Sequence, residues 1–232
     1  MYESAVCAGT PIIKLLTEEL AANKIAKISG MLNGTSNFIL SNMEEGSEFN
    51  STLALAQKEG YAEPDPAFDI EGMDAAHKIG ILSSIAYGTS LPPEDFYVEG
   101  ITEIQKSDFH YAMEMGYTIK HLAVAKLDKN NIELRAHPAL INLDSHLANL
   151  KGVRNGMEID TDLIGKIHIA GSGAGQESTA SGVVSDLVHL ANSNINISES
   201  TKKNKCDLID LLHVTDLTDV TKITRMTKVA NM

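Results

Sequence analysis

Residues 60–78 of the chain read GYAEPDPAFDIEGMDAAHK, and this stretch decides most about the fold and its chemistry. Proline fixes φ and glycine allows tight turns, so we expect an ordered loop rather than a flexible one. The loop is strongly acidic. Its five carboxylates lie among two prolines and two glycines, just before a helix: Glu63, Asp65, Asp69, Glu71 and Asp74.

The end of this stretch predicts a helix over residues 73–87. Asp74 and Lys78 are four residues apart and therefore share one helical face, with the acid on the N-terminal side of the base. The alternative is a solvated surface pair, which stabilises a helix by roughly 0.2–0.5 kcal/mol. The neighbouring apolar residues recur at helical spacing and should face a core, which places the pair at the edge of a buried surface: Ala75, Ile79, Leu82 and Ala86.

Composition bounds the classes of protein to consider. The chain has 232 residues, of which 43% are hydrophobic, enough for one good core or for one domain with an appendage. Its net charge of -12 argues against nucleic acid or an anionic membrane surface as a partner, because both select clustered Lys and Arg. Cys7 and Cys206 lie far apart and form no metal or redox motif. We find no membrane-spanning run or signal-peptide pattern and expect a cytoplasmic protein.

Alternating helical and extended stretches predict an α+β fold. We expect helices over residues 11–22, 37–43, 51–59, 73–87, 108–115 and 178–191. Strands are expected over residues 25–32, 119–127 and 132–141, with a hairpin connection at 128–131. Two more extended runs surround residues 157–170, with a turn at 160–162, and residues 91–93 mark a loop. The pattern predicts a mixed, largely antiparallel sheet with helices packed on one face.

The end of the chain differs from the rest in amino-acid composition. Asn, Ser, Thr and Lys dominate from residue 193 to residue 204. We therefore expect one domain over residues 1–193 and a polar C-terminal tail over residues 194–232. Residues 208–214 suit one or two turns of amphipathic helix, and we assign the tail no function.

Four further segments carry a family resemblance together with residues 63–78: 6–13 (VCAGTPII), 32–40 (LNGTSNFIL), 171–175 (GSGAG) and 179–181 (TAS). From about Tyr2 to Asn192 the chain resembles the catalytic and dimerisation domain of homoserine dehydrogenases, with the signature at identical spacing. The resemblance implies interconversion of L-homoserine and L-aspartate 4-semialdehyde with NADP or NAD, in threonine, methionine and isoleucine biosynthesis. It also implies the α+β fold of that domain and a homodimer, because the family pairs its catalytic-domain sheets.

The resemblance assigns roles within the acidic stretch. Lys78 matches the family's general acid/base lysine, and an ammonium suits proton donation to a developing alkoxide. Asp74 would hold that lysine. The substrate carries an α-ammonium that carboxylates attract, and Glu63 and Asp74 match the family's substrate contacts. Asp69 matches a third acidic position near the site.

Gly60, Glu63 and Gly175 match positions that contact the cofactor in the family. For Gly60 the alternative is a helix C-cap after residue 59, and both roles can hold. Residues 171–175 mimic a dinucleotide fingerprint, but the glycine spacing differs from G-x-G-x-x-G and no second βαβ unit follows. The alternative for this loop is a glycine turn that lets a helix pack close to a sheet.

The start of the chain matches a cation site that the family builds largely from backbone carbonyls, at Glu3, Val6, Ala8 and Thr10. Such oxygens suit a monovalent ion such as sodium. The alternative is a plain strand-to-helix turn. The turn at residues 33–35 is expected near the substrate pocket, although a β-to-α turn also explains it.

Two more side chains have weaker signals. His137 precedes Pro138 at a strand end and is the histidine to test as catalytic, with a structural role as the alternative. Cys7 lies in an apolar run, so we expect it to be buried and inert.

Homoserine dehydrogenases of ordinary length begin with a Rossmann domain, and this sequence has none before Tyr2. We therefore expect weak NAD(P) binding by the chain alone, because most cofactor contacts and a further lysine belong to that domain. One hypothesis is a homoserine dehydrogenase seen as its catalytic part. The alternative is an inactive or split-enzyme module that dimerises or complements a partner carrying the cofactor domain. A third hypothesis is an unrelated nucleotide binder that uses residues 171–175.

Overall fold

A computed structural model describes residues 2–89, 95–129 and 131–193 of the chain. These residues belong to two compact units. One unit comprises Tyr2–Gly182, and the described part of the other comprises residues 183–193. No helix of the described residues is long and apolar enough to cross a membrane. The predicted loop at 91–93, the predicted helical turns at 208–214 and Cys206 fall outside the described residues.

Six strands of the first unit form one sheet in the order β2-β4-β3-β1-β5-β6. Neighbouring strands are antiparallel except β2 and β4, which are parallel. The mixed, largely antiparallel sheet is therefore confirmed. The strands are β1 (Ile25–Met31), β2 (Tyr97–Val98), β3 (Tyr117–Asp128), β4 (Asn131–Asn142), β5 (Arg154–Thr161) and β6 (Lys166–Ser172).

The turn between β5 and β6 lies later than the predicted residues 160–162. β5 continues to Thr161, whose backbone N–H and hydroxyl both donate to the Gly165 carbonyl, at 2.9 and 2.8 Å. Gly165 has φ of +76°, in the left-handed region that favours glycine. The glycine, which the sequence analysis did not weigh, fixes the position of this turn.

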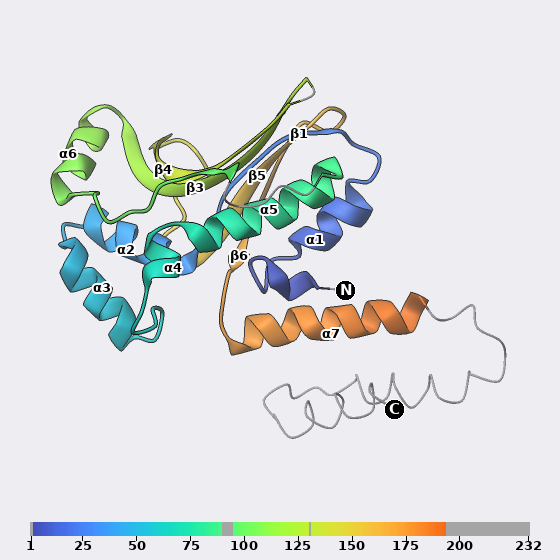
Figure 1. Cartoon of the computed structure of the whole chain (residues 1–232), viewed down its shortest axis with the longest axis horizontal. Coiled ribbons are helices and arrows are strands. Elements are labelled where there is room, and N and C mark those ends of the chain that lie inside the picture. The colour runs from blue at the N-terminus through green and yellow to red at the C-terminus, as the bar shows by residue number, and fades with distance from the viewer. Residues whose placement is uncertain (1, 90–94, 130, 194–232) are drawn as a thin grey trace. The chain divides into compact units, whose positions relative to one another are not determined.

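Helix α5 (Met73–Tyr87) covers one face of the sheet, as Figure 1 shows, and has the predicted bounds. Beside it run α1 (Ile12–Lys14) and the π-helical segment η2 (Leu15–Glu19), so the helix predicted over 11–22 is shorter and changes its winding. The three helical segments α1, η2 and α5 bury their apolar residues against the sheet in one cluster. The helical members are Ile12, Leu16, Ala75, Ala76, Ile79 and Leu82, and the strand members are Ile28, Ala123, Ala125 and Ile159.

A second group of helices gathers at one end of the sheet in Figure 1. It comprises α2 (Gly34–Glu44), α3 (Phe49–Lys58) and α6 (Lys106–Glu114), which confirm the predicted helices at 37–43, 51–59 and 108–115 with earlier starts. Two of those starts have visible causes. Asn33 caps α2 by accepting the Ser36 N–H, and α6 begins in a capping box between Gln105 and Asp108.

On the other face of the sheet, part of the cover comes from the non-helical segment between β4 and β5. Leu147 and Leu150, from the segment between β4 and β5, pack on Met31, Leu122 and Val124. Along β6 the inward isoleucines alternate with side chains that are exposed on this face: Lys166, His168, Ala170 and Ser172.

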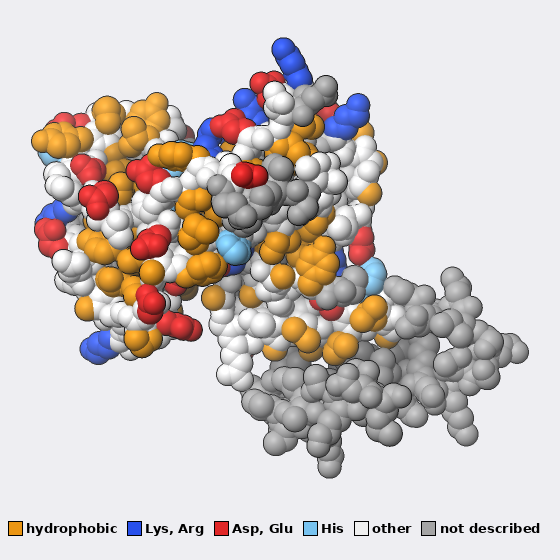
Figure 2. Space-filling model, viewed as in Figure 1, with side chains coloured by type: hydrophobic (Ala, Val, Ile, Leu, Met, Phe, Trp, Pro, Cys, Tyr) orange, Lys and Arg blue, Asp and Glu red, His pale blue; other side chains and the backbone are white. Residues whose placement is uncertain are grey.

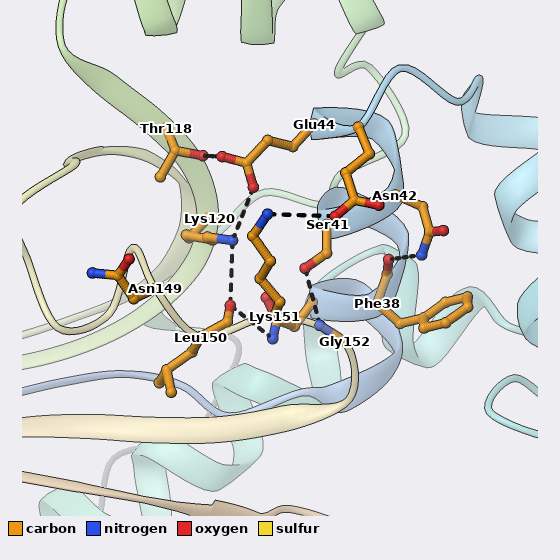
Figure 3. A network of polar contacts seen from close by, with 12 residues as sticks. Phe38, Ser41, Asn42, Glu44, Thr118, Lys120, Asn149, Leu150, Lys151 and Gly152 are labelled. Atoms are coloured by element: carbon orange, nitrogen blue, oxygen red, sulfur yellow. Dashed lines mark hydrogen bonds and ion pairs between the residues drawn. The ribbon is translucent and has the colours of Figure 1, made fainter.

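A buried lysine ties α2 to this face (Figure 3). The side chain of Lys120 is 0% exposed, and its Nζ lies 3.6 Å from Glu44 Oε2 and donates to the Leu150 carbonyl at 3.3 Å. Thr118 Oγ1 donates to the other Glu44 oxygen at 2.7 Å. Burial lowers the pKa of Lys120, and the Glu44 carboxylate opposes that shift.

The face drawn in Figure 2 is acidic over α3, α6 and the short helix α4 (Ala67–Ile70), where few Lys and Arg lie among the Asp and Glu side chains.

Candidate active site

The turn before α5 places the first functional side chains. Gly72 has φ of +88°, and a Cβ there would lie 3.0 Å from His121 Nε2 and 3.2 Å from the Glu99 carbonyl. Both the conformation and the space therefore require glycine. The helix begins at the next residue, with Asp74 in its first turn, where a carboxylate suits the positive end of the helix dipole. Lys78 follows one turn later on the same face.

Asn33 connects α2 with the acidic residues. Its Oδ1 accepts the N–H of Ser36 at 2.8 Å and so caps α2. Its Nδ2 donates to Asp69 Oδ1 and to Asp74 Oδ2, each at 2.7 Å. One amide thus fixes two carboxylates relative to the start of a helix. The sequence analysis placed this turn near the pocket but did not predict that Asn33 bridges the two carboxylates.

Lys78 is held from two sides. Its Nζ donates to Asp74 Oδ2 at 2.7 Å and to the Leu32 carbonyl at 3.0 Å. The side chains of Lys78 and Asp74 are 20% and 18% exposed, so the pair is neither free in water nor sealed. An ammonium has three N–H donors, and these contacts engage two of them. The geometry differs from a solvated surface pair, because a backbone carbonyl and an amide add fixed contacts.

The acidic loop is anchored to α2. Thr35 Oγ1 donates to the Tyr61 carbonyl at 2.7 Å, and Ser36 Oγ donates to the Asp69 carbonyl at 3.1 Å. Within the loop lies a short helix, α4 (Ala67–Ile70), that the sequence analysis did not predict. These contacts agree with the ordered loop expected from its prolines and glycines.

Glu63 stands apart from Asp74 and Lys78. Its side chain is exposed, and no hydrogen bond in the described part of the chain joins its carboxylate to Asp74. The loop is held there through the main chain, because Gln57 Nε2 donates to the carbonyls of Glu63 and Pro64 at 3.2 and 3.3 Å. The structure therefore brings together Asp69, Asp74 and Lys78, and leaves Glu63 open to solvent.

The two glycines expected near a cofactor are both selected by conformation. Gly60 has φ of +78° directly after α3 and donates its N–H to the Gln57 carbonyl, which is the helix C-cap geometry. Gly175 has φ of +113° just before α7 (Gln176–Ser193). A Cβ at either position would meet nothing within 4 Å, so neither glycine is required by crowding.

The N-terminal turn is built around Glu3 and Cys7. The carboxylate of Glu3 is buried and accepts the N–H groups of Ile13 and Lys14 at 2.9 and 3.0 Å. Cys7 has φ of +53°, and burial raises the pKa of its thiol to about 12, in agreement with the inert role expected. Thr10 Oγ1 is buried and accepts or donates no hydrogen bond within the described residues.

His137 lies outside this cluster. Its ring is half-buried on β4, with Nδ1 2.7 Å from the Pro138 carbonyl and the ring edge against Tyr97. These contacts favour the structural role. Among the described residues, no group of three or more His, Cys, Asp or Glu could hold a metal ion.

Two aromatic pairs flank the acidic loop and were not singled out from the sequence. Phe38 and Tyr61 have ring centroids 5.0 Å apart, and Phe68 meets His77 edge-on at 5.3 Å. Tyr61 and Phe68 remain exposed and add apolar surface beside the carboxylates. Each pair joins residues from different elements, so spacing along the chain gave no signal for them.

Known proteins resemble the chain in sequence and in structure. The family model described as Homoserine dehydrogenase matches residues 11–188. A homoserine dehydrogenase of Pseudomonas aeruginosa is 50% identical over 188 residues, which cover 81% of this chain and 43% of that protein. The chain thus spans about half the length of the curated relatives that it matches.

Two solved structures give the same picture. The homoserine dehydrogenase of Thiobacillus denitrificans matches with a TM-score of 0.79 and 48% identity, over 84% of this chain and 47% of that one. A hyperthermophilic archaeal homoserine dehydrogenase in complex with NADPH matches with a TM-score of 0.68 and 33% identity, over 80% of this chain and 53% of that one.

Proposed function

The chain belongs to the homoserine dehydrogenase family, and we propose that it forms the part of such an enzyme that binds the substrate and transfers the proton. The reaction is L-homoserine + NAD(P)+ = L-aspartate 4-semialdehyde + NAD(P)H, in threonine, methionine and isoleucine biosynthesis. One observation carries the proposal. Lys78 Nζ is held by Asp74 and the Leu32 carbonyl at 2.7 and 3.0 Å, with a donor left over at a partly exposed position.

Fixed carboxylates support recognition of an amino alcohol. The α-ammonium of homoserine seeks anionic acceptors, and Asp69 and Asp74 are both held by Asn33 before any substrate arrives. Glu63 is exposed on a loop anchored through Gln57 and is free to turn toward the substrate. We assign these three carboxylates to substrate binding. Glu63 is also assigned to the cofactor side of the pocket.

Lys78 serves as the general acid in reduction and, as the neutral amine, as the general base in oxidation. In reduction it donates a proton to the aldehyde oxygen as that oxygen becomes an alkoxide, which yields the hydroxyl of homoserine. Asp74 and the Leu32 carbonyl keep the ammonium aimed throughout. A bound nicotinamide cofactor supplies or accepts the hydride.

The chain's own residues fit a nicotinamide cofactor in part. Gly60 and Gly175 are exposed and carry no side chain to obstruct a nucleotide, and Glu63 lies on the loop after Gly60. The loop at 171–175 follows β6, which pairs antiparallel with β5, so it is not the first turn of a parallel dinucleotide-binding unit. We therefore propose NADP or NAD as cofactor and weak binding by the chain alone.

We extend the proposal to a monovalent cation such as sodium, held by Glu3, Val6, Ala8 and Thr10. The buried Thr10 Oγ1, which has no hydrogen-bond partner among the residues that the structure describes, supports it, since a hard cation prefers such oxygens. The Glu3 carboxylate accepts the N–H groups of Ile13 and Lys14, and we assign the backbone carbonyl of Glu3 to the ion. Replacing sodium by choline at equal ionic strength should lower the melting temperature of the chain. An unchanged melting temperature would remove the ion from the proposal.

A homodimer is the assembly we propose. The face of the sheet opposite α5 exposes alternate residues of β6, and cover elsewhere comes from the segment between β4 and β5. A second copy packed on this face would bury that surface. Sedimentation equilibrium should give twice the chain mass, and a monomer at working concentrations contradicts this assignment.

The central test measures NADPH-dependent reduction of aspartate semialdehyde with the chain alone and with a supplied cofactor domain. Turnover in the assembled protein, lost in Lys78→Ala, supports the proposal. Folded dimer without turnover in either arrangement favours the alternative, an inactive module. Activity that needs mixing of two separate chains identifies a split enzyme. The cytoplasmic location stays a prediction from the sequence.

A further inference from the structure

Asn155 joins two segments that the proposed reaction uses. It lies in β5 with 1% of its surface exposed, and its Nδ2 donates to the Met31 carbonyl at 2.9 Å. Its Oδ1 is buried and has no hydrogen-bond partner within the described residues. Burial raises the pKa of the neighbouring Cys7 thiol, and the contact with Asn155 opposes that rise. A buried amide that leaves its oxygen unpaired calls for an explanation, because such groups are normally paired.

The oxygen of Asn155 occupies the space beside Gly173. A Cβ at Gly173 would lie 1.4 Å from Asn155 Oδ1 and 2.1 Å from its Cγ. Gly173 is buried although its neighbours on both sides are exposed, so the loop at 171–175 dips onto the amide at this residue. Unlike Gly175, Gly173 does not have a positive φ, and space alone requires glycine there.

The nitrogen of the same amide holds the end of β1. The next two residues after Met31 supply the fixed contacts of the candidate site. Leu32 accepts a hydrogen bond from Lys78 Nζ, and Asn33 binds both Asp69 and Asp74. A displaced Asn155 would therefore shift the chain that positions the lysine and the two carboxylates.

We propose that Asn155 is a positioning residue that sets the spacing between the glycine loop at 171–175 and the Lys78 site. The inference rests on the proposed function, in which Gly175 of the same loop contacts the cofactor. The amide group is planar and rigid. Its nitrogen fixes the end of β1 while its oxygen limits how closely Gly173 approaches, so one group relates the cofactor side of the pocket to the proton donor.

The test is a double-mutant cycle of Gly173→Ala and Asn155→Ala in the full chain, assembled as the active enzyme. Gly173→Ala should lower kcat/KM by about 100-fold, because its Cβ displaces the amide. Asn155→Ala should lower it by about 10-fold and raise the KM for homoserine. The double variant should be no worse than Asn155→Ala, since the collision has been removed. Losses that multiply in the double variant would overturn the proposal.

Asn37 offers a matched control. It is also buried, its Nδ2 donates to the Arg154 carbonyl at 3.0 Å, and its Oδ1 likewise has no partner in the described part of the chain. Asn37→Ala should lower the melting temperature without raising the KM for homoserine, and its effect should multiply with that of Gly173→Ala. An equal rise in KM for Asn37→Ala would show general loosening and contradict a specific role of Asn155.

Hydrogen exchange gives a readout that does not need turnover. The Ser36 amide donates to Asn33 Oδ1, so its exchange rate reports the placement of Asn33. Gly173→Ala should speed this exchange by about 10-fold or more, whereas Ala174→Ser, at an exposed position of the same loop, should not. If no assembly shows dehydrogenase activity, the proposed function fails. The difference in Ser36 exchange between the two variants still tests whether the glycine loop at 171–175 is coupled to Asn33. Equal exchange in both variants would refute it.

Discussion

Two lysine–carboxylate pairs in the first unit make opposite use of the same chemistry. Lys78 and Asp74 lie 2.7 Å apart with 20% and 18% of their side chains exposed. Lys120 and Glu44 lie 3.6 Å apart with 0% and 11% exposed. The first pair keeps a donor within reach of a ligand, whereas the second is closed off by β3, α2 and the segment that follows β4. Solvent access rather than charge distinguishes Lys78, the proton donor that we propose, from Lys120, which has a structural role.

The energetics of the two pairs differ in the same sense. Solvent reaches the Lys78 pair and screens it in part, so its ion pairing should contribute less to stability than that of a closed pair. Burial makes the charged form of Lys120 less favourable and lowers its pKa. The Glu44 carboxylate partly compensates for this loss of solvation. Loss of a partner should therefore affect activity in the first pair and stability in the second.

The largest expected effect separates the pairs by activity. Lys78→Ala in the assembled enzyme should lower kcat by about 1,000-fold, because it removes the proton donor that we propose. Its free energy of unfolding should change by less than about 1 kcal/mol. Lys120→Met should keep kcat within a few-fold. Steady-state kinetics measures kcat, and urea denaturation measures the free energy of unfolding, for both variants.

Lys58→Ala is a control for the first prediction, since Lys58 ends α3 at an exposed position. It should change neither kcat nor stability. If Lys78→Ala keeps most of the turnover, the lysine is not the proton donor and the contrast between the pairs disappears.

The second effect appears in stability. Glu44→Gln leaves the Lys120 ammonium buried without a counter-charge and should cost about 3–5 kcal/mol at neutral pH. Asp74→Asn should cost about 1 kcal/mol. Chemical denaturation measures both. Equal losses would mean that the difference in burial has no energetic consequence.

The pH dependence of the Glu44→Gln variant adds a check. The pKa of Lys120 in the folded protein lies below its ordinary value of 10.5, so between the two values the unfolded chain binds more protons. Stability gained from this group therefore rises with pH through that interval. Removing Glu44 lowers the folded pKa further, and the rise in stability should begin at lower pH than in the wild type.

A third prediction replaces the buried pair altogether. Lys120→Met with Glu44→Leu removes both charges and should recover most of the stability lost in Glu44→Gln. Thr118 loses its acceptor in this variant, which should cost about 1 kcal/mol. A double variant as unstable as Glu44→Gln would show that the pair contributes more than mutual neutralisation.

The sequence allowed prediction of one pair and not of the other for a physical reason. Asp74 and Lys78 are one helical turn apart, so their contact follows from local geometry. Lys120 and Glu44 come from a strand and a helix far apart along the chain, and no local pattern relates them. The same limit explains Asn33, whose spacing identifies a helix cap but cannot reveal the two carboxylates it binds in space.

Most of the fold was predictable, because its strands and helices have clear periodicity. One misplaced feature has its cause in a single residue, because Gly165 delays the turn after β5. The segment after Pro11 also differs from the prediction and ends as a π-helix. The roles of Glu63, Gly60 and Gly175 came from the family resemblance, since spacing alone cannot supply a ligand.

The smallest expected effect concerns His121, a buried histidine next to Gly72, where α5 begins. Its ring is 4% exposed, and Nε2 lies 2.9 Å from the Glu99 carbonyl. Burial lowers its pKa from 6.5, the Glu99 carbonyl opposes that shift, and His137 adds to it. The unfolded chain therefore binds the proton first as pH falls below 6.5, so acid should remove stability until the folded pKa is passed.

His121→Gln isolates this term, because an amide can still donate to the Glu99 carbonyl but does not titrate. The difference in unfolding free energy between wild type and variant should change between about pH 7 and about pH 5, in the direction of a relatively less stable wild type at acid pH. Urea denaturation across this range measures it. Carboxylates titrate in both proteins and cancel in the difference. Parallel curves would mean that His121 is protonated in the folded state, and that burial at this position does not control charge as it does at Lys120.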